Sequence, residues 1–104
     1  MIQVKYTPAS QVVCTVLDEH EAVLLHLETK HYYVLNETGT LIWECLQKGE
    51  PLHVIAAALA QEYHIDKDEA LQDVVQFLDM LSQEHLVERK DISLHTNPSI
   101  RKAS

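Results

Sequence analysis

The spacing of hydrophobic residues along the chain changes once, within residues 31–43. Before this segment apolar residues alternate along the chain, as in strands, over residues 11–17, 22–27 and 31–35. After it they recur every third or fourth residue, as in helices. At the boundary an aromatic and β-branched run ends at Asn36, a residue favoured at helix N-termini. We therefore expect an antiparallel meander of three strands followed directly by helices.

Three helices are expected after the strands. The first begins at Asn36 and stops near Gly49, and Pro51 suits the first turn of the second. Asp66 has a glutamate three residues later, an aspartate variant of the capping box, and the third helix runs to about Glu84. A helix pair with a tight turn and a small sheet beside it is typical of a winged helix-turn-helix. The predicted fold class is therefore α+β, with a three-stranded antiparallel sheet followed by three helices.

Two of the strands carry expectations about burial. Both faces of residues 11–17 are largely apolar, so we expect this strand to be covered on more than one side. The strand at residues 22–27 has a weaker apolar face holding His26, where a partly buried imidazole needs only a hydrogen-bond partner. Its stronger apolar face consists of Val23, Leu25 and Leu27.

The chain of 104 residues fits one modest domain. Residues 1–10 are expected to form an N-terminal arm or a short extra strand, residues 11–88 the folded domain, and residues 89–104 a flexible polar tail. No apolar run approaches the roughly 20 residues that cross a bilayer. The N-terminus also lacks the pattern of a signal peptide, so a cytoplasmic location is expected.

Charge argues against two classes of partner. The net charge is −8, which repels nucleic acid and membrane surfaces. The third helix, which is the recognition helix in a DNA-binding protein of this outline, carries several acids and only one lysine, Lys67. DNA binding is therefore disfavoured, and an acidic winged-helix regulator or interaction module remains as an alternative.

The sequence offers little for catalysis. Its seven histidines show no His-x-x-x-His or His–Cys spacing that presets a metal site. Cys14 and Cys45 are 31 positions apart with no sign of an electropositive pocket around either. The chain has only two glycines, which excludes a glycine-rich phosphate loop. We expect no enzyme activity of its own, no metal and no cofactor.

An exposed strand edge suggests peptide binding instead. A peptide that pairs with the strand at 31–35 gains main-chain hydrogen bonds and lies against the third helix, where pockets select its side chains. The expected contacts from the strand are His31, Tyr32, Tyr33, Val34 and Leu35. Those from one strip of the helix are Glu69, Asp73, Gln76, Phe77 and Met80. Phe77 and Met80 fit a buried core equally well, and one of the two tyrosines is expected to point inward.

Several of these segments resemble the PqqD-like domains, also called RiPP precursor peptide recognition elements. The most specific is Tyr-Tyr-x-Leu-Asn at residues 32–36, followed by Gly39 and Ile42-Trp43. Val23-Leu24-Leu25 and the helical positions of residues 73–81 extend the resemblance, which covers about residues 11–88. It implies a winged helix-turn-helix-like fold that binds the leader of a ribosomally made precursor peptide. The leader adds to the third strand beside the third helix, and the domain delivers the precursor to a modifying enzyme or leader peptidase.

The sequence departs from the PqqD pattern at two places, and these departures narrow the expected function. The Leu-Leu-x-Pro-Glu-Gly run of PqqD itself is replaced here by residues 24–29, Leu-Leu-His-Leu-Glu-Thr, which argues against a role in pyrroloquinoline quinone maturation. The turn at residues 28–30 also lacks the common glycine. As a free-standing copy, the chain resembles the discrete recognition proteins of lasso peptide clusters, which work with a separate leader peptidase and cyclase. A chaperone for a radical SAM peptide-modifying enzyme is the alternative within the family, and an exposed edge can also form a homodimer.

Overall fold

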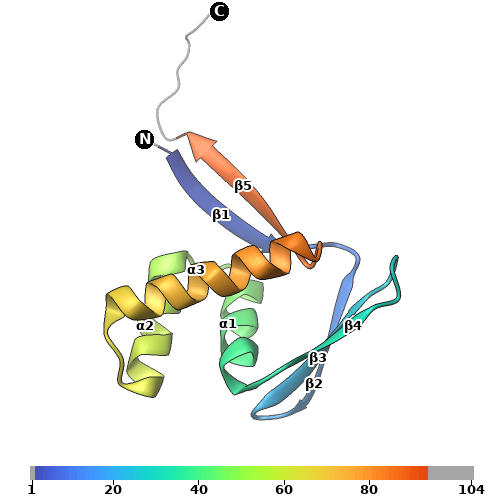
Figure 1. Cartoon of the computed structure of the whole chain (residues 1–104), viewed down its shortest axis with the longest axis horizontal. Coiled ribbons are helices and arrows are strands. Elements are labelled where there is room, and N and C mark those ends of the chain that lie inside the picture. The colour runs from blue at the N-terminus through green and yellow to red at the C-terminus, as the bar shows by residue number, and fades with distance from the viewer. Residues whose placement is uncertain (1, 94–104) are drawn as a thin grey trace, which may run out of the picture.

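Two separate antiparallel sheets flank three helices in the computed structural model, which describes residues 2–93 (Figure 1). The elements in chain order are β1 (Ile2–Pro8), β2 (Val12–Asp18), β3 (Glu21–His26), β4 (Tyr32–Leu35), α1 (Glu37–Gln47), α2 (Leu52–Tyr63), α3 (Lys67–Gln83) and β5 (Val87–Ser93). The predicted order of three strands and three helices is confirmed for the segment from β2 to α3. None of the helices described is both long and apolar enough to cross a membrane.

The three-stranded sheet has the order β2-β3-β4, as expected for a meander. Leu24 pairs with Cys14 on one side and with Tyr33 on the other, so β3 is central and β4 lies at an edge. The β3–β4 turn has no glycine, and Lys30 adopts the positive φ of 67° there. His26 Nδ1 accepts hydrogen bonds from the backbone N–H groups of Glu28 and Thr29, at 3.2 and 3.3 Å. His26 therefore has the partner that its burial requires, and it fixes this turn.

The burial expected for β2 and β3 was wrong. In β3 the buried residues are Ala22, Leu24 and His26, whereas Val23 and Leu25 are only half-buried and face away from the helices. Both faces of β3 are apolar, so alternation could not identify the inner one. No residue of β2 is fully buried. The strand has only β3 as a neighbour in the sheet, and the helices cover one side of its start alone.

The second sheet pairs β1 with β5 over their whole lengths, from Ile2 opposite Ser93 to Pro8 opposite Val87. The extra strand predicted within residues 1–10 is therefore present. In contrast, residues 89–93, where we expected the start of a polar tail, belong to strand β5. Their polar sequence is compatible with a ribbon that projects from the body (Figure 1). The rest of the predicted tail, residues 94–104, lies outside the described part of the chain.

Local signals set the helix ends. Asn36 caps α1, with its side-chain oxygen accepting the Gly39 N–H at 2.9 Å. Asn36 is the single residue between β4 and α1. The Thr40 hydroxyl of α1 donates to the Leu35 carbonyl of β4 at 3.4 Å, which links the two elements across this junction. Asp66 caps α3 by accepting the Asp68 N–H at 3.0 Å. His64 ends α2 in the left-handed conformation, with φ of 55°, which allows the tight connection to α3.

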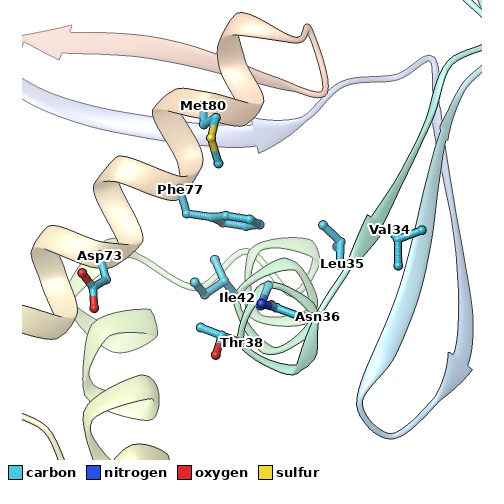
Figure 2. Close-up of a pocket in the computed structure, with 9 residues that line it drawn as sticks. Val34, Leu35, Asn36, Thr38, Ile42, Asp73, Phe77 and Met80 are labelled. Carbon is cyan, nitrogen blue, oxygen red and sulfur yellow. The ribbon is translucent and has the colours of Figure 1, made fainter.

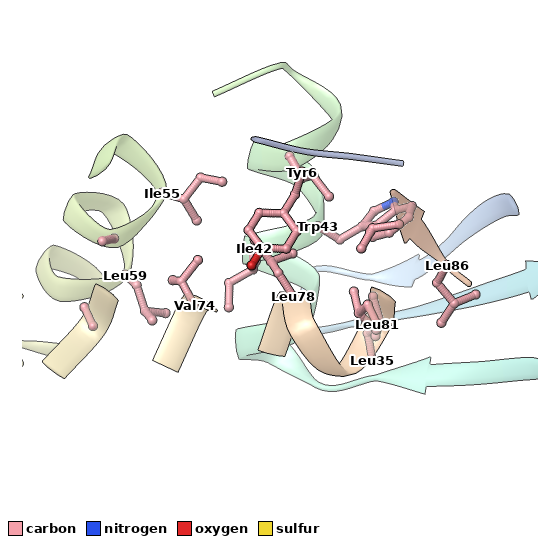
Figure 3. Close-up of a cluster of buried hydrophobic side chains, with 14 of the residues drawn as sticks. Tyr6, Leu35, Ile42, Trp43, Ile55, Leu59, Val74, Leu78, Leu81 and Leu86 are labelled. Carbon is pink, nitrogen blue, oxygen red and sulfur yellow. The ribbon is translucent and has the colours of Figure 1, made fainter. Parts of the chain in front are cut away.

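The core lies between the helices and the inner faces of both sheets (Figure 3). Trp43 of α1 is 1% exposed, and Leu78 of α3 and Leu86, just before β5, are completely buried. Burial of such side chains contributes about 1.5–3 kcal/mol each. Tyr6 brings β1 into the same cluster, and its hydroxyl donates to Asp79 Oδ1 of α3 at 2.6 Å. This core holds β4, α1 and α3 in fixed positions relative to one another.

Candidate functional site

The outer edge of β4 offers unpaired backbone groups. The His26 N–H donates to the His31 carbonyl at 2.9 Å, which fixes the alternation of bonded pairs between β3 and β4. Tyr33 and Leu35 therefore direct their N–H and C=O groups towards β3, and Tyr32 and Val34 direct theirs away from it. Within residues 2–93 no strand pairs with this outer edge. A second chain in extended conformation could form hydrogen bonds there.

An open cavity of about 320 Å³ lies beside this edge, between β4, α1 and α3 (Figure 2). Residues from all three elements line it: Val34, Leu35, Asn36, Thr38, Gly39, Ile42, Asp73, Phe77 and Met80. We refer to these residues as the cleft. Because the edge and the cleft adjoin, a strand added to β4 would direct alternate side chains towards α3.

Phe77 occupies the centre of the cleft, where its ring extends from α3 towards α1 (Figure 2). A Cβ atom built on Gly39 would lie 3.1 Å from Phe77 Cζ, tighter than an ordinary van der Waals contact. The missing side chain at Gly39 thus allows the ring to approach the first turn of α1. Ile42, which is 1% exposed, and the half-buried Phe77 form an apolar floor.

The two ends of the cleft differ in polarity. On α3, Asp73 lies about one turn before Phe77, and Met80 lies about one turn after it (Figure 2). Met80 is 57% exposed, unlike the core residues of the same helix, and its thioether is an adaptable apolar surface. The arrangement fits an extended peptide with an apolar side chain at the centre and a basic residue near Asp73.

The structure brings five of the ten predicted contact residues into the cleft. These are Leu35, Asp73, Phe77 and Met80, together with Val34, which borders the cleft while its side chain points away from it (Figure 2). The other five lie nearby without lining it: His31, Tyr32, Tyr33, Glu69 and Gln76. As predicted for the two tyrosines, they point in opposite directions. Tyr32 is 70% exposed, and Tyr33 packs against the core while its hydroxyl donates to Glu84 Oε1 at 3.0 Å.

The contribution of α1 to the cleft was missed. Asn36, Thr38, Gly39 and Ile42 form one wall, although we placed the site only between the strand and the third helix. Gly39 was the available signal, because glycine in the first turn of a helix lowers helix stability unless another group must approach closely. Asn36 therefore has two structural roles, since its side chain caps α1 and the residue also lines the cleft.

The two cysteines lie apart from the cleft and are poor nucleophiles. Burial raises the pKa of the Cys14 thiol, and Glu44 raises it further. Burial also raises the pKa of Cys45, against a lowering effect of Lys48 and with additional raising by Glu50 and Glu44. Both thiols therefore stay protonated at neutral pH, whereas nucleophilic cysteines need the thiolate.

Comparison with known proteins assigns the fold to a family. The family model described as coenzyme PQQ synthesis protein D (PqqD) matches residues 21–87, which include β4, α1 and α3. The chain belongs to the PqqD family. This confirms the resemblance drawn from residues 32–43 and places the whole cleft of this PqqD-family chain inside the matched region. No curated protein gives a significant match to the sequence.

Two solved structures are similar to this PqqD-family chain over most of its length. One is TbiB1 in complex with the TbiA(beta) leader peptide, with 34% sequence identity, coverage of 79% of this chain and 94% of TbiB1, and a TM-score of 0.75. The other is lasso peptide synthetase B1 complexed with the leader peptide, with 23% identity, coverage of 81% and 98%, and a TM-score of 0.74. The similarity to lasso peptide synthetase B1, at 23% identity, supports the fold alone. The similarity to TbiB1, at 34% identity, extends to the sequence as well.

Proposed function

We propose that this chain binds the leader segment of a ribosomally synthesised precursor peptide in lasso peptide biosynthesis. The leader adds as a strand to the outer edge of β4 and lies in the cleft beside α3. The observation that carries the proposal is the open cleft next to an unpaired strand edge, in a chain 34% identical to a protein solved with its leader peptide.

Main-chain pairing accounts for the orientation of the guest. The N–H and C=O groups of Tyr32 and Val34 are the ones directed outward, so the guest strand bonds to these two residues. Its side chains then alternate between the cleft and the opposite side of the sheet. An apolar guest side chain reaches Phe77 and Ile42, and burying it supplies the sequence preference that main-chain bonds lack.

The proposed role is delivery without catalysis. The raised pKa values of Cys14 and Cys45 argue against a thiolate nucleophile in this chain. A separate leader peptidase or modifying enzyme therefore acts on the precursor while the leader is held. We place this activity in the cytoplasm, where precursor peptides are synthesised.

Titration with a synthetic leader peptide of the cognate precursor tests the proposal. We expect a Kd of roughly 1 μM or below, which corresponds to about −8 kcal/mol. Phe77→Ala should weaken binding at least tenfold, because it removes the floor of the cleft. Leu71→Ala is the matched control, because Leu71 lies on the same helix, is exposed and is absent from the cleft.

The location of binding needs its own readout. In an NMR titration we expect the largest shift changes in β4 and α3, with Phe77→Ala still showing a dispersed, folded spectrum. Shift changes confined to residues 88–104 would reject strand addition. Equal leader affinity in wild type and folded Phe77→Ala would remove α3 from the site.

A further inference from the structure

The β3–β4 turn is held by a buried histidine that does not line the cleft. His26 is 4% exposed, whereas the turn residues that follow it are exposed to solvent. Its Nδ1 atom accepts two backbone hydrogen bonds, from Glu28 N–H at 3.2 Å and from Thr29 N–H at 3.3 Å. This pattern assigns the ring proton to Nε2, because an atom that accepts N–H groups carries no proton. The imidazole is thus a fixed acceptor for the turn.

The turn needs such support because part of its backbone is strained. Lys30 has φ of 67°, in the left-handed region, where a side chain crowds the backbone and glycine does not. Strained residues persist where the surrounding bonds over-determine their conformation. Two further bonds do so here: the Lys30 N–H donates to the His26 carbonyl at 2.8 Å, and Thr29 Oγ1 accepts the His31 N–H at 3.2 Å. His26 therefore contributes both its side chain and its backbone to the turn.

The conformation of this turn sets where β4 begins. The strand has only four residues, and Tyr32, its first, carries outward backbone groups. Tyr33 and Leu35 bond to β3, and the Thr40 hydroxyl fixes the far end of the strand through the Leu35 carbonyl. The near end follows directly from the turn that His26 holds. In so short a strand, the alignment of the outward groups depends on both ends.

We propose that His26 is a positioning residue for the leader: it holds the β3–β4 turn so that the outer edge of β4 can pair with a guest strand. This proposal rests on the proposed function. The guest does not touch the imidazole, because the ring is buried and outside the cleft. Loss of the acceptor lowers the fraction of molecules whose edge is competent to pair. The apparent leader affinity then falls by the same factor.

Two substitutions separate the hydrogen bonds of His26 from its packing. His26→Phe keeps a ring and removes the acceptor. His26→Asn removes most of the ring and keeps an acceptor, since asparagine side chains commonly bond the backbone N–H two residues on, as Nδ1 bonds to Glu28 here. With a synthetic leader peptide of the cognate precursor, we expect His26→Phe to bind about tenfold more weakly than wild type. His26→Asn should restore the affinity to within about threefold of wild type.

Binding kinetics distinguish a positioning role from a direct contact. In His26→Phe the association rate constant should fall about tenfold, while the dissociation rate constant changes less than about twofold. A side chain that contacts the guest would change the dissociation rate instead. Hydrogen exchange on the free protein gives a readout without leader. The amide hydrogens of Tyr33 and Leu35, which bond to β3, should exchange faster in His26→Phe than in wild type or His26→Asn.

Two further variants complete the design. Thr29→Val removes the bond from the His31 N–H at an exposed position, so it disturbs the same turn without touching the core. It should weaken leader binding about threefold and keeps the proposal testable if a His26 variant unfolds. His53→Phe is the matched control, because His53 is an exposed histidine on α2 outside the cleft. Its leader affinity should equal that of wild type.

The outcomes separate this proposal from the one on which it rests. Wild-type leader affinity in folded His26→Phe, or in Thr29→Val if His26→Phe unfolds, would overturn the positioning role. So would equal losses in His26→Phe and His26→Asn, because affinity would then not follow the acceptor. A faster dissociation that accounts for the whole loss would also overturn it. A wild-type protein that fails to bind the leader at all would instead overturn the proposed function.

Discussion

Phe77 lies against Gly39 so closely that a single added methyl group on the glycine would reach within 3.1 Å of the ring. The two residues come from α3 and α1, and their contact sets the place of the Phe77 ring in the floor of the cleft. The position of the ring is therefore set by the absence of a side chain 38 positions earlier in the sequence. A substitution at this contact can therefore change leader binding while leaving the stability of the fold nearly unchanged.

Gly39→Ala should weaken leader binding with little change in stability. Alanine favours the helix by about 0.5–1 kcal/mol over glycine, which offsets the strain of moving the ring. The displaced ring no longer forms the same floor, so we expect leader affinity to fall about fivefold to tenfold. Calorimetry and urea unfolding on the same preparation measure both effects.

The control for this substitution is Gly49→Ala. Gly49 has φ of 80° with no atom within 4 Å of the added Cβ, so its alanine variant suffers backbone strain without contact. We expect a loss of about 1–2 kcal/mol of stability and unchanged leader affinity. In a Phe77→Leu background, Gly39→Ala should have a reduced effect, and additive effects of the two changes would contradict a direct contact.

Proline substitution at the β4 edge should abolish leader binding. Val34→Pro removes an outward N–H that no strand within residues 2–93 uses, so the sheet keeps its own hydrogen bonds. Val16→Pro is the matched control, because the bond from the Leu27 N–H to the Gln11 carbonyl sets an alternation in which the Val16 N–H points away from β3, at the opposite free edge of the same sheet. If both variants fold and bind the leader equally, the guest does not pair with β4.

Asp73 should select a basic residue in the leader. Asp73→Asn removes the carboxylate in the cleft, and we expect affinity to fall threefold to tenfold at low salt with a weaker salt dependence. Glu69→Gln removes a charge one turn earlier on α3, outside the cleft, and should change affinity less than twofold. Equal losses in the two variants would mean that only the overall charge matters.

Tyr6 makes stability depend on alkaline pH. Burial, followed by the hydrogen bond to Asp79 and the charge of that carboxylate, raises its pKa from 10.0 to about 12. The contribution of Tyr6 is fully present below about pH 10 and is lost as the pH rises towards 12, because the unfolded chain loses the proton first. The free energy of unfolding should therefore fall in this window by at most about 1.4 kcal/mol per pH unit from this group.

Tyr6→Phe isolates that effect. The variant should lose about 1 kcal/mol at neutral pH together with the hydrogen bond. Its urea-unfolding free energy should decline less steeply than that of wild type between pH 10 and 12. If the free energies of unfolding of the two proteins fall in parallel with pH, the Tyr6 hydroxyl has the same pKa in the folded and the unfolded state.

Features encoded by neighbouring residues could be predicted from the sequence. The strand-to-helix junction depends on Asn36 and the groups next to it, and the start of α3 depends on Asp66, so each signal lies within a few positions of its effect. The cleft was predicted in part for the same reason. Asp73, Phe77 and Met80 follow helical periodicity, and Leu35 follows strand periodicity.

Features that depend on distant partners could not be predicted. Strand β5 forms because Val87 to Ser93 meets a strand 79 to 91 residues earlier, and its polar sequence gives no sign of this pairing. The inner face of β3 was misassigned because Val23 and Leu25 are more apolar than Ala22 and His26, although the latter pair is buried. Both faces of β3 carry apolar side chains, so the sequence pattern did not show which face packs against the helices.

The brevity of β4 has a kinetic consequence. The strand spans only Tyr32–Leu35, and two of its residues direct backbone groups outward. Every extended peptide gains the same few main-chain bonds, so its residence time depends on what the cleft side chains add. Dissociation rates rather than association rates usually distinguish related ligands. Under the proposed strand addition, a short edge therefore favours rapid release of the guest peptide.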